Sequence, residues 1–101
     1  MLQLAIPIPS ITGTQDIEIE MTINNQRQKM HFRVEVYSWN DCEMVTENRI
    51  DCIRDLVNRY GKEWMIYHIG IPTEDYVPLT FVRTEDWERQ RRLILEVVKH
   101  N

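Results

Sequence analysis

Three histidines and two cysteines are the side chains in this sequence whose types best suit catalysis or metal binding. They are His31, His68, His100, Cys42 and Cys52, and none of them shows the close spacing found in structural zinc sites. The chain also lacks the glycine patterns of phosphate-binding and dinucleotide-binding loops, the nucleophile elbow and the zinc-protease helix. We therefore predict no cofactor, no bound metal and no catalytic residue set, and we favour a protein that is not an enzyme.

The two cysteines are expected to remain free thiols. If Cys42 and Cys52 both lie on the helix predicted below, they are about 15 Å apart along its axis. A disulfide tolerates a Cα separation of only about 7 Å. Residues 1–7 lack the basic region of a signal peptide, and no apolar run reaches the roughly 18 residues that span a membrane. We expect a cytoplasmic protein with no membrane association.

The overall charge argues against nucleic acid as a partner. Twelve Lys and Arg residues and sixteen Asp and Glu residues give a net charge of −4. An acidic chain lacks the general attraction for phosphates that supplies most non-specific affinity for nucleic acids. The basic residues within 88–92 can pair with acids on their own helix, which is the ordinary role of such a cluster.

Alternation of apolar and polar residues predicts a β-hairpin over residues 16–37. Its register stays open, because a two-residue and a four-residue loop both keep the apolar faces together. An extended arm, residues 1–15, should precede it, since Pro7 and Pro9 lack the backbone N–H that a central strand needs.

A first helix is predicted over residues 41–60. Asn40 with Glu43 fits a capping box, and Thr46 is a later alternative start. Gly61 stands where a helix ends in the left-handed conformation.

Residues 64–83 are predicted to form two further strands, followed by a helix over 85–100. The stretch 64–71 is apolar on both faces, which is typical of a central strand, so periodicity leaves open which of its faces is exposed. Pro78 directs the strand over 76–83 toward a sheet edge. Together the elements predict a single α+β domain, an arm followed by ββαββα, with an antiparallel or mixed sheet and two helices on one face.

The sheet face turned away from the helices is the candidate binding surface. We expect Ile17, Phe32 and their apolar neighbours to face the helices, with Leu79 and Phe81 in the core. The later strands would then turn outward the residues Trp64, Ile66, His68, Tyr76, Thr80 and Val82. Across this surface, the candidate binding residues are His31, Arg33, Glu35, Trp64, His68 and Tyr76.

An exposed apolar patch of this kind predicts association, because monomers rarely leave one uncovered. We expect a homodimer that acts as a protein-interaction module, with a different protein as a further partner class. The alternative is a small-molecule-binding or enzymatic protein with a site on the open sheet face near His68 and His31.

Overall fold

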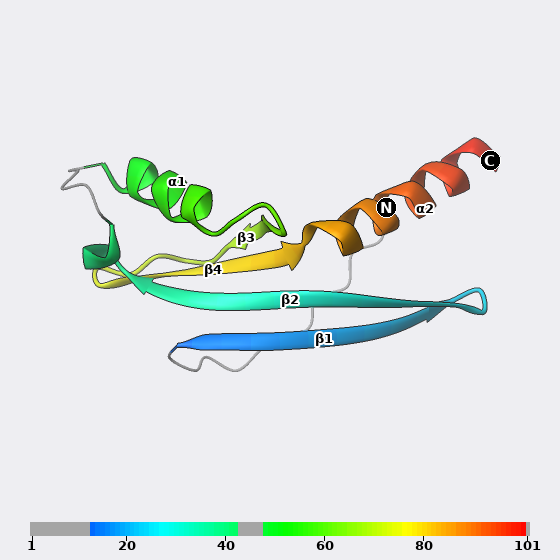
Figure 1. The fold of residues 1–101 in the computed structure, drawn as a ribbon, viewed down its shortest axis with the longest axis horizontal. Coiled ribbons are helices and arrows are strands. Elements are labelled where there is room, and N and C mark those ends of the chain that lie inside the picture. The colour runs from blue at the N-terminus through cyan, green and yellow to red at the C-terminus, as the bar shows by residue number, and fades with distance from the viewer. Residues whose placement is uncertain (1–12, 43–47, 101) are drawn as a thin grey trace.

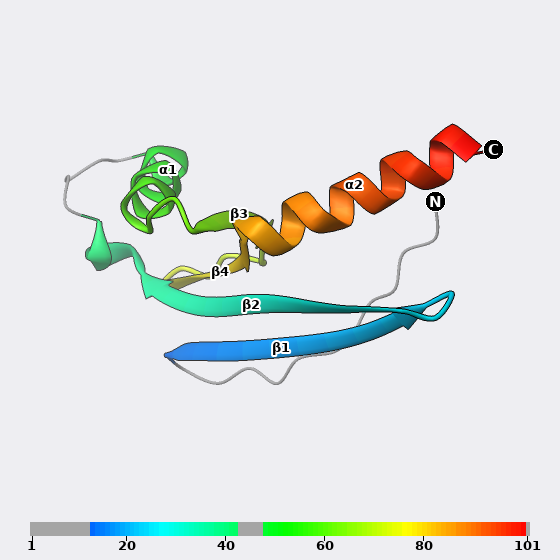
Figure 2. The ribbon, with the colours of Figure 1, turned by 45° about the vertical axis from the view of Figure 1, so that its right-hand side comes forward.

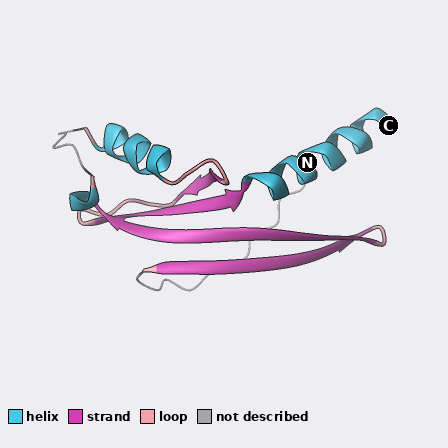
Figure 3. Ribbon diagram, viewed as in Figure 1, coloured by secondary structure: helices cyan, strands magenta, loops and turns pink. Residues whose placement is uncertain are grey.

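The computed structural model of the chain describes residues 13–42 and 48–100 and contains a four-stranded antiparallel sheet with two α-helices (Figures 1 and 3). The elements are β1 (Thr14–Ile23), β2 (Gln26–Ser38), the 3-10 helix η1 (Trp39–Asp41), α1 (Arg49–Arg59), β3 (Trp64–Ile69), β4 (Tyr76–Arg83) and α2 (Thr84–His100). Both helices lie on the same side of the β1–β2 ribbon in Figures 1 and 2. The predicted α+β class and the order ββαββα are confirmed. Of the predicted arm, all but residues 13–15 lies outside the described residues.

The hairpin is confirmed, and its loop has two residues. Asn24 and Asn25 both have positive φ, 50° and 65°, and Ile23 pairs with Gln26 across the turn. Two consecutive left-handed residues form the tight turn whose twist matches that of the flanking strands. Asparagine tolerates this conformation better than most residues, which selects the shorter of the two predicted loops.

The positions of the last two strands are the reverse of those predicted. The strand order is β1-β2-β4-β3, so β4 is central and β3 is an edge strand. Pro78 is tolerated in the central strand because it lies beyond the last β3 pair, Ile69 with Leu79. Its carbonyl accepts a hydrogen bond from the Gly70 N–H at 2.8 Å, so the position that lacks an N–H faces the end of β3, where the ladder stops.

Helix α1 is shorter than predicted and begins at Arg49. The Asn48 side chain caps it by accepting a hydrogen bond from the Ile50 N–H at 3.0 Å. The capping box predicted at Asn40 is wrong, because Ser38 and Asp41 form the box and Asn40 lies inside η1. Glu43 and Thr46 lie outside the described residues. The predicted C-terminus is confirmed, since the helix ends at Arg59 and Gly61 has φ 104°.

Cys42 and Cys52 form a disulfide, which corrects the prediction of free thiols. Their Cα atoms are 5.6 Å apart. The prediction failed because it placed both residues on one helix. Cys42 has extended backbone after η1, whereas Cys52 lies in the first turn of α1, so the two cysteines belong to different elements.

The core lies between α1 and β4. Cys52 and Leu56 of α1 pack on Val77, Leu79 and Phe81, three β4 side chains that are fully buried. Burying each such side chain stabilises the fold by about 1.5–3 kcal/mol. Helix α1 therefore covers the sheet face on which these three β4 side chains lie.

This packing reverses the predicted orientation of the hairpin. The register pairs Arg33 with Phe81, Glu35 with Leu79 and Tyr37 with Val77, so the polar residues of β2 share the face that α1 covers. Phe32 pairs with Val82 and lies on the opposite face together with its hairpin partner Ile17. β2 tolerates this arrangement because it lies beside the α1–β4 contact, where its polar groups are only partly buried.

The residues that were expected to face outward together do not form one surface, so this prediction is wrong. Trp64 and Ile66 pack against the core, and Val82 is fully buried. His68 and Tyr76 are exposed, while Thr80 is half-buried.

Candidate functional site

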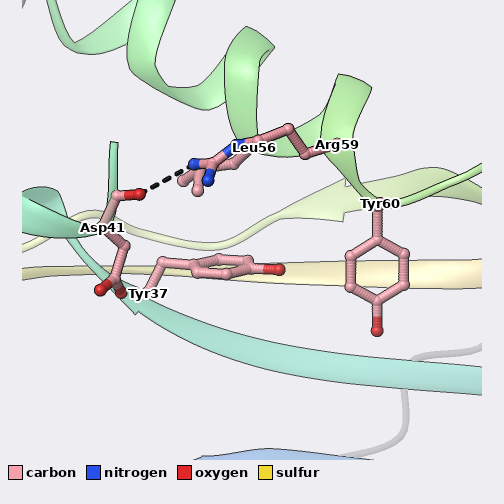
Figure 4. Close-up of a pocket in the computed structure, with 5 residues that line it drawn as sticks. All are labelled: Tyr37, Asp41, Leu56, Arg59 and Tyr60. Carbon is pink, nitrogen blue, oxygen red and sulfur yellow. Dashed lines mark hydrogen bonds between the residues drawn. The ribbon is translucent and has the colours of Figure 1, made fainter. Parts of the chain in front are cut away.

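Two neighbouring hollows lie where the C-terminal end of α1 meets β2. The smaller, of about 290 Å³, is lined by Tyr37, Asp41, Leu56, Arg59 and Tyr60 (Figure 4). The larger, of about 750 Å³, shares Arg59 and Tyr60 and adds Arg33, Glu35, Gly61, Lys62, Glu63 and Trp64. Basic and aromatic side chains thus lie together around the end of one helix.

Arg33 is fixed in the larger hollow by three contacts. Its Nε donates to Asp16 Oδ1 at 2.6 Å, and its Nη1 donates to the Tyr60 hydroxyl at 3.4 Å. Its guanidinium carbon lies 4.6 Å from the centre of the Trp64 ring, within cation–π range. The hydrogen bonds to Asp16 and Tyr60 raise the pKa of Arg33 further above its ordinary value, so the side chain is a permanent cation here.

The two tyrosines of the hollows are protonated at neutral pH. Burial raises the pKa of Tyr37, and the neighbouring Glu35 raises it further. Burial also raises the pKa of Tyr60, although the hydrogen bond from Arg33 opposes the shift. The Tyr60 ring stacks on Phe81 with the ring centres 3.8 Å apart. These phenols can donate hydrogen bonds, but they are poor bases or nucleophiles near pH 7.

The other positions around the hollows are held by hydrogen bonds to nearby elements. Figure 4 shows Arg59, from the end of α1, opposite Tyr37 of β2. Arg59 Nη2 donates to the Asp41 carbonyl at 2.8 Å and lies 3.3 Å from Asp55 Oδ2. The Thr84 N–H donates to the Glu63 carbonyl at 2.8 Å, which fixes the loop after α1 to the start of α2. These contacts fix the positions of the side chains and the loop that line the two hollows.

The structure brings together three of the six candidate binding residues. Arg33, Glu35 and Trp64 line the larger hollow. His68 and Tyr76 are exposed elsewhere, on β3 and at the start of β4. The sequence gives no signal that Tyr37, Arg59 and Tyr60 share a site, because only the tertiary structure places the end of α1 against β2.

His31 and His68 do not form a joint site. His68 pairs with Thr80, which pairs with Val34, so it belongs to the face opposite that of His31. His31 Nδ1 lies 2.9 Å from Asp86 Oδ2, and its Nε2 lies 3.3 Å from Glu18 Oε2. Both ring nitrogens are therefore engaged, and His31 joins the hairpin to the first turn of α2.

The outer side of β3 carries a second candidate surface. Tyr67, Ile69, Ile71 and Tyr76 are 47–89% exposed, and we call these four residues the edge strip. Tyr67 and Ile69 lie on β3, Ile71 follows it, and Tyr76 begins β4. The exposed Tyr67 ring also contacts the rings of Phe32 and Trp87, with ring centres 5.2 and 5.8 Å away. The sequence signal was present as an uncharged apolar run, but it was interpreted as a central strand.

Comparison with known protein families, curated proteins and solved structures found no match for the chain. Within residues 13–42 and 48–100, no helix is long and apolar enough to cross a membrane. The same described residues include no group of three or more His, Cys, Asp or Glu side chains that could hold a metal ion.

Proposed function

We propose that this chain is a homo-oligomeric protein-interaction module and that it associates through the edge strip. The observation that carries the proposal is the exposure of Ile69 and Ile71, at the end of the edge strand β3 and just after it, with Tyr67 of β3 and Tyr76 of β4 about half exposed. Grouped, exposed apolar side chains are rare on the surfaces of monomers, and where they occur they often mark interaction sites.

The chemistry of the strip favours a second copy of the chain as the partner. Two copies of the chain repel each other, because each has a net charge of −4. A stable contact between them therefore needs a surface whose own side chains are uncharged. None of the four edge-strip side chains is acidic or basic, so contact between these side chains desolvates no charge of their own. Glu74 and Asp75, which precede Tyr76, are exposed and would have to stay in solvent at the rim of the contact. Twofold dimers are the commonest closed assemblies and bury the same patch on both subunits.

Sedimentation equilibrium at several protein concentrations tests the proposal. We expect a dimer for the natural sequence. A variant with Ile69→Lys and Ile71→Lys should shift the equilibrium toward monomer by about tenfold or more, because it places charge in an apolar interface.

Ile23→Lys is the matched control. Ile23 is an isoleucine at the end of β1, the strand at the opposite edge of the sheet, and it is 52% exposed. It should leave the dimer unchanged. A monomer at every concentration, or equal weakening by both variants, would overturn the proposal.

A small-molecule site in the larger hollow is the second candidate function. The observation in its favour is a lining that combines the Trp64 ring with three cations, Arg33, Arg59 and Lys62, although Glu35 and Glu63 also line the hollow. This lining suits a small aromatic carboxylate. We expect benzoate to shift the Gly61 amide resonance, and Lys62→Gln to weaken binding several-fold while Lys29→Gln does not. If millimolar benzoate causes no shift, this candidate fails.

The disulfide bears on where the protein works. Disulfides persist in oxidising compartments and are rare in the cytoplasm. The cytoplasmic location stays a prediction, and the Cys42–Cys52 pair favours an oxidising compartment over it. Mass spectrometry after rapid thiol blocking in cells tests this, because a cytoplasmic protein should carry two blocked thiols.

A further inference from the structure

Within residues 13–42 and 48–100, no strand pairs with the outer side of β3. The Gly70 N–H points at β4, where it donates to the Pro78 carbonyl at 2.8 Å. Because backbone groups alternate in direction along a strand, the N–H and C=O of Ile69 point away from β4. β3 is the last of the four strands formed by the described residues, so these groups lie on the outer edge of that sheet.

The β3 edge lacks the features that usually prevent strand pairing. Edge strands are commonly protected by charged side chains or by proline. Trp64–Ile69 contains no proline and no Asp, Glu, Lys or Arg. Its residues are mostly aromatic and β-branched types that favour strands.

The strand at the opposite edge of the sheet, β1, carries acidic side chains. These are Asp16, Glu18 and Glu20. Antiparallel pairing of two β1 edges would bring these carboxylates near those of the second copy, and like charges across strands are destabilising. Pairing of two β3 edges brings no such charges together, so charge selects β3.

We infer that β3 pairs antiparallel with β3 of a second copy and that the two four-stranded sheets become one continuous eight-stranded sheet. This inference rests on the proposed self-association and specifies how it occurs. Main-chain hydrogen bonds join the two edges, and Ile69 with the neighbouring β3 side chains packs against the same residues of the second copy across the twofold axis. Aromatic and β-branched side chains on adjacent strands add to the stability of such a pair.

Amide hydrogen exchange tests strand pairing without any substitution. The Ile69 amide should exchange at least about tenfold more slowly at concentrations where the dimer forms than where the monomer predominates. The Asn25 amide, in the hairpin turn, should show no dependence on concentration. A dimer in which Ile69 gains no protection would overturn strand pairing but leave self-association standing.

A backbone variant gives an independent test. Ile69→Pro removes an N–H that points away from β4, so it leaves the β3–β4 hydrogen bonds in place. We expect it to lose the dimer, whereas Ile69→Val, which keeps the amide and the branched side chain, should retain it. A folded Ile69→Pro dimer contradicts the inference.

The two proposals fail in distinguishable ways. A protein that stays monomeric at all concentrations contradicts both of them. Protection of the Ile69 amide in a monomer means that another part of the same chain, or an extended segment of another protein, pairs with the edge, and this contradicts the inference.

Discussion

Asp86 accepts two hydrogen bonds from His31, one from the backbone N–H at 2.8 Å and one at Nδ1 at 2.9 Å. The carboxylate is 4% exposed and also pairs with Arg89 at 3.0 Å. β4 pairs with β2 only from Phe32 onward, so the His31 N–H has no strand partner on that side. Asp86 therefore replaces a ladder hydrogen bond and attaches the start of α2 to the hairpin.

Asp86→Asn should destabilise the fold by about 1–3 kcal/mol at pH 7, because a charged acceptor with two donors is lost in a buried position. Urea unfolding measures the change. Glu85→Gln is the control, since the neighbouring Glu85 is exposed and should cost little. An Asp86→Asn protein with unchanged stability would show that the His31 contacts do not hold α2.

The same carboxylate predicts a loss of stability in acid. Burial alone would raise the pKa of Asp86, but hydrogen bonds from His31 outweigh it and hold that pKa below its ordinary value of 3.8. Ionised Asp86 thus stabilises the fold above about pH 4, and this contribution is lost as the pH falls through the lower, folded-state pKa. Unfolding measured from pH 5 to pH 2 should show a smaller acid loss in Asp86→Asn than in the natural sequence.

Alkaline pH should destabilise the protein through its buried phenols. The pKa values of Tyr37 and Tyr60 are raised in the folded state. The contribution of the protonated phenols to the free energy of unfolding is therefore complete below the ordinary tyrosine pKa of about 10, and it falls as the pH rises above that value. Ultraviolet titration should show phenols that ionise late. Tyr37→Phe should remove part of this late absorbance change, and an unaltered titration would contradict the assignment.

Gly70→Ala should destabilise the junction after β3 by about 1–3 kcal/mol through overpacking. A Cβ at this position would lie 2.5 Å from Pro78 Cγ. Pro78→Ala removes that atom, so the double variant should lose less stability than the two single changes together. Thermal unfolding of the four proteins completes the cycle, and strict additivity would contradict the contact.

Reduction of the Cys42–Cys52 disulfide should lower stability by about 3 kcal/mol, the chain-entropy value for a loop of this length. Urea unfolding with and without reductant measures it. A variant with both cysteines replaced by serine should be insensitive to reductant. Equal sensitivity of the variant and the natural sequence would point to another effect of the reductant.

Local patterns in the sequence were enough to predict the type and order of the strands and α-helices, but not where α1 begins. Alternation from Asp16 to Tyr37 determines the hairpin, because a strand exposes successive side chains to opposite faces. Apolar spacing up to Tyr60, followed by Gly61, determines the end of α1. These signals depend on residues close together in the chain, and the structure agrees with them.

Long-range packing decided the rest. Whether β3 or β4 is central depends on which strand buries more apolar area against α1, and Val77, Leu79 and Phe81 decide this for β4. The disulfide and the hollow around Arg33 likewise require elements that are distant in sequence to meet. Periodicity identifies the apolar side of each strand, but the choice of which element covers that side follows from the total area buried, which only the folded chain determines.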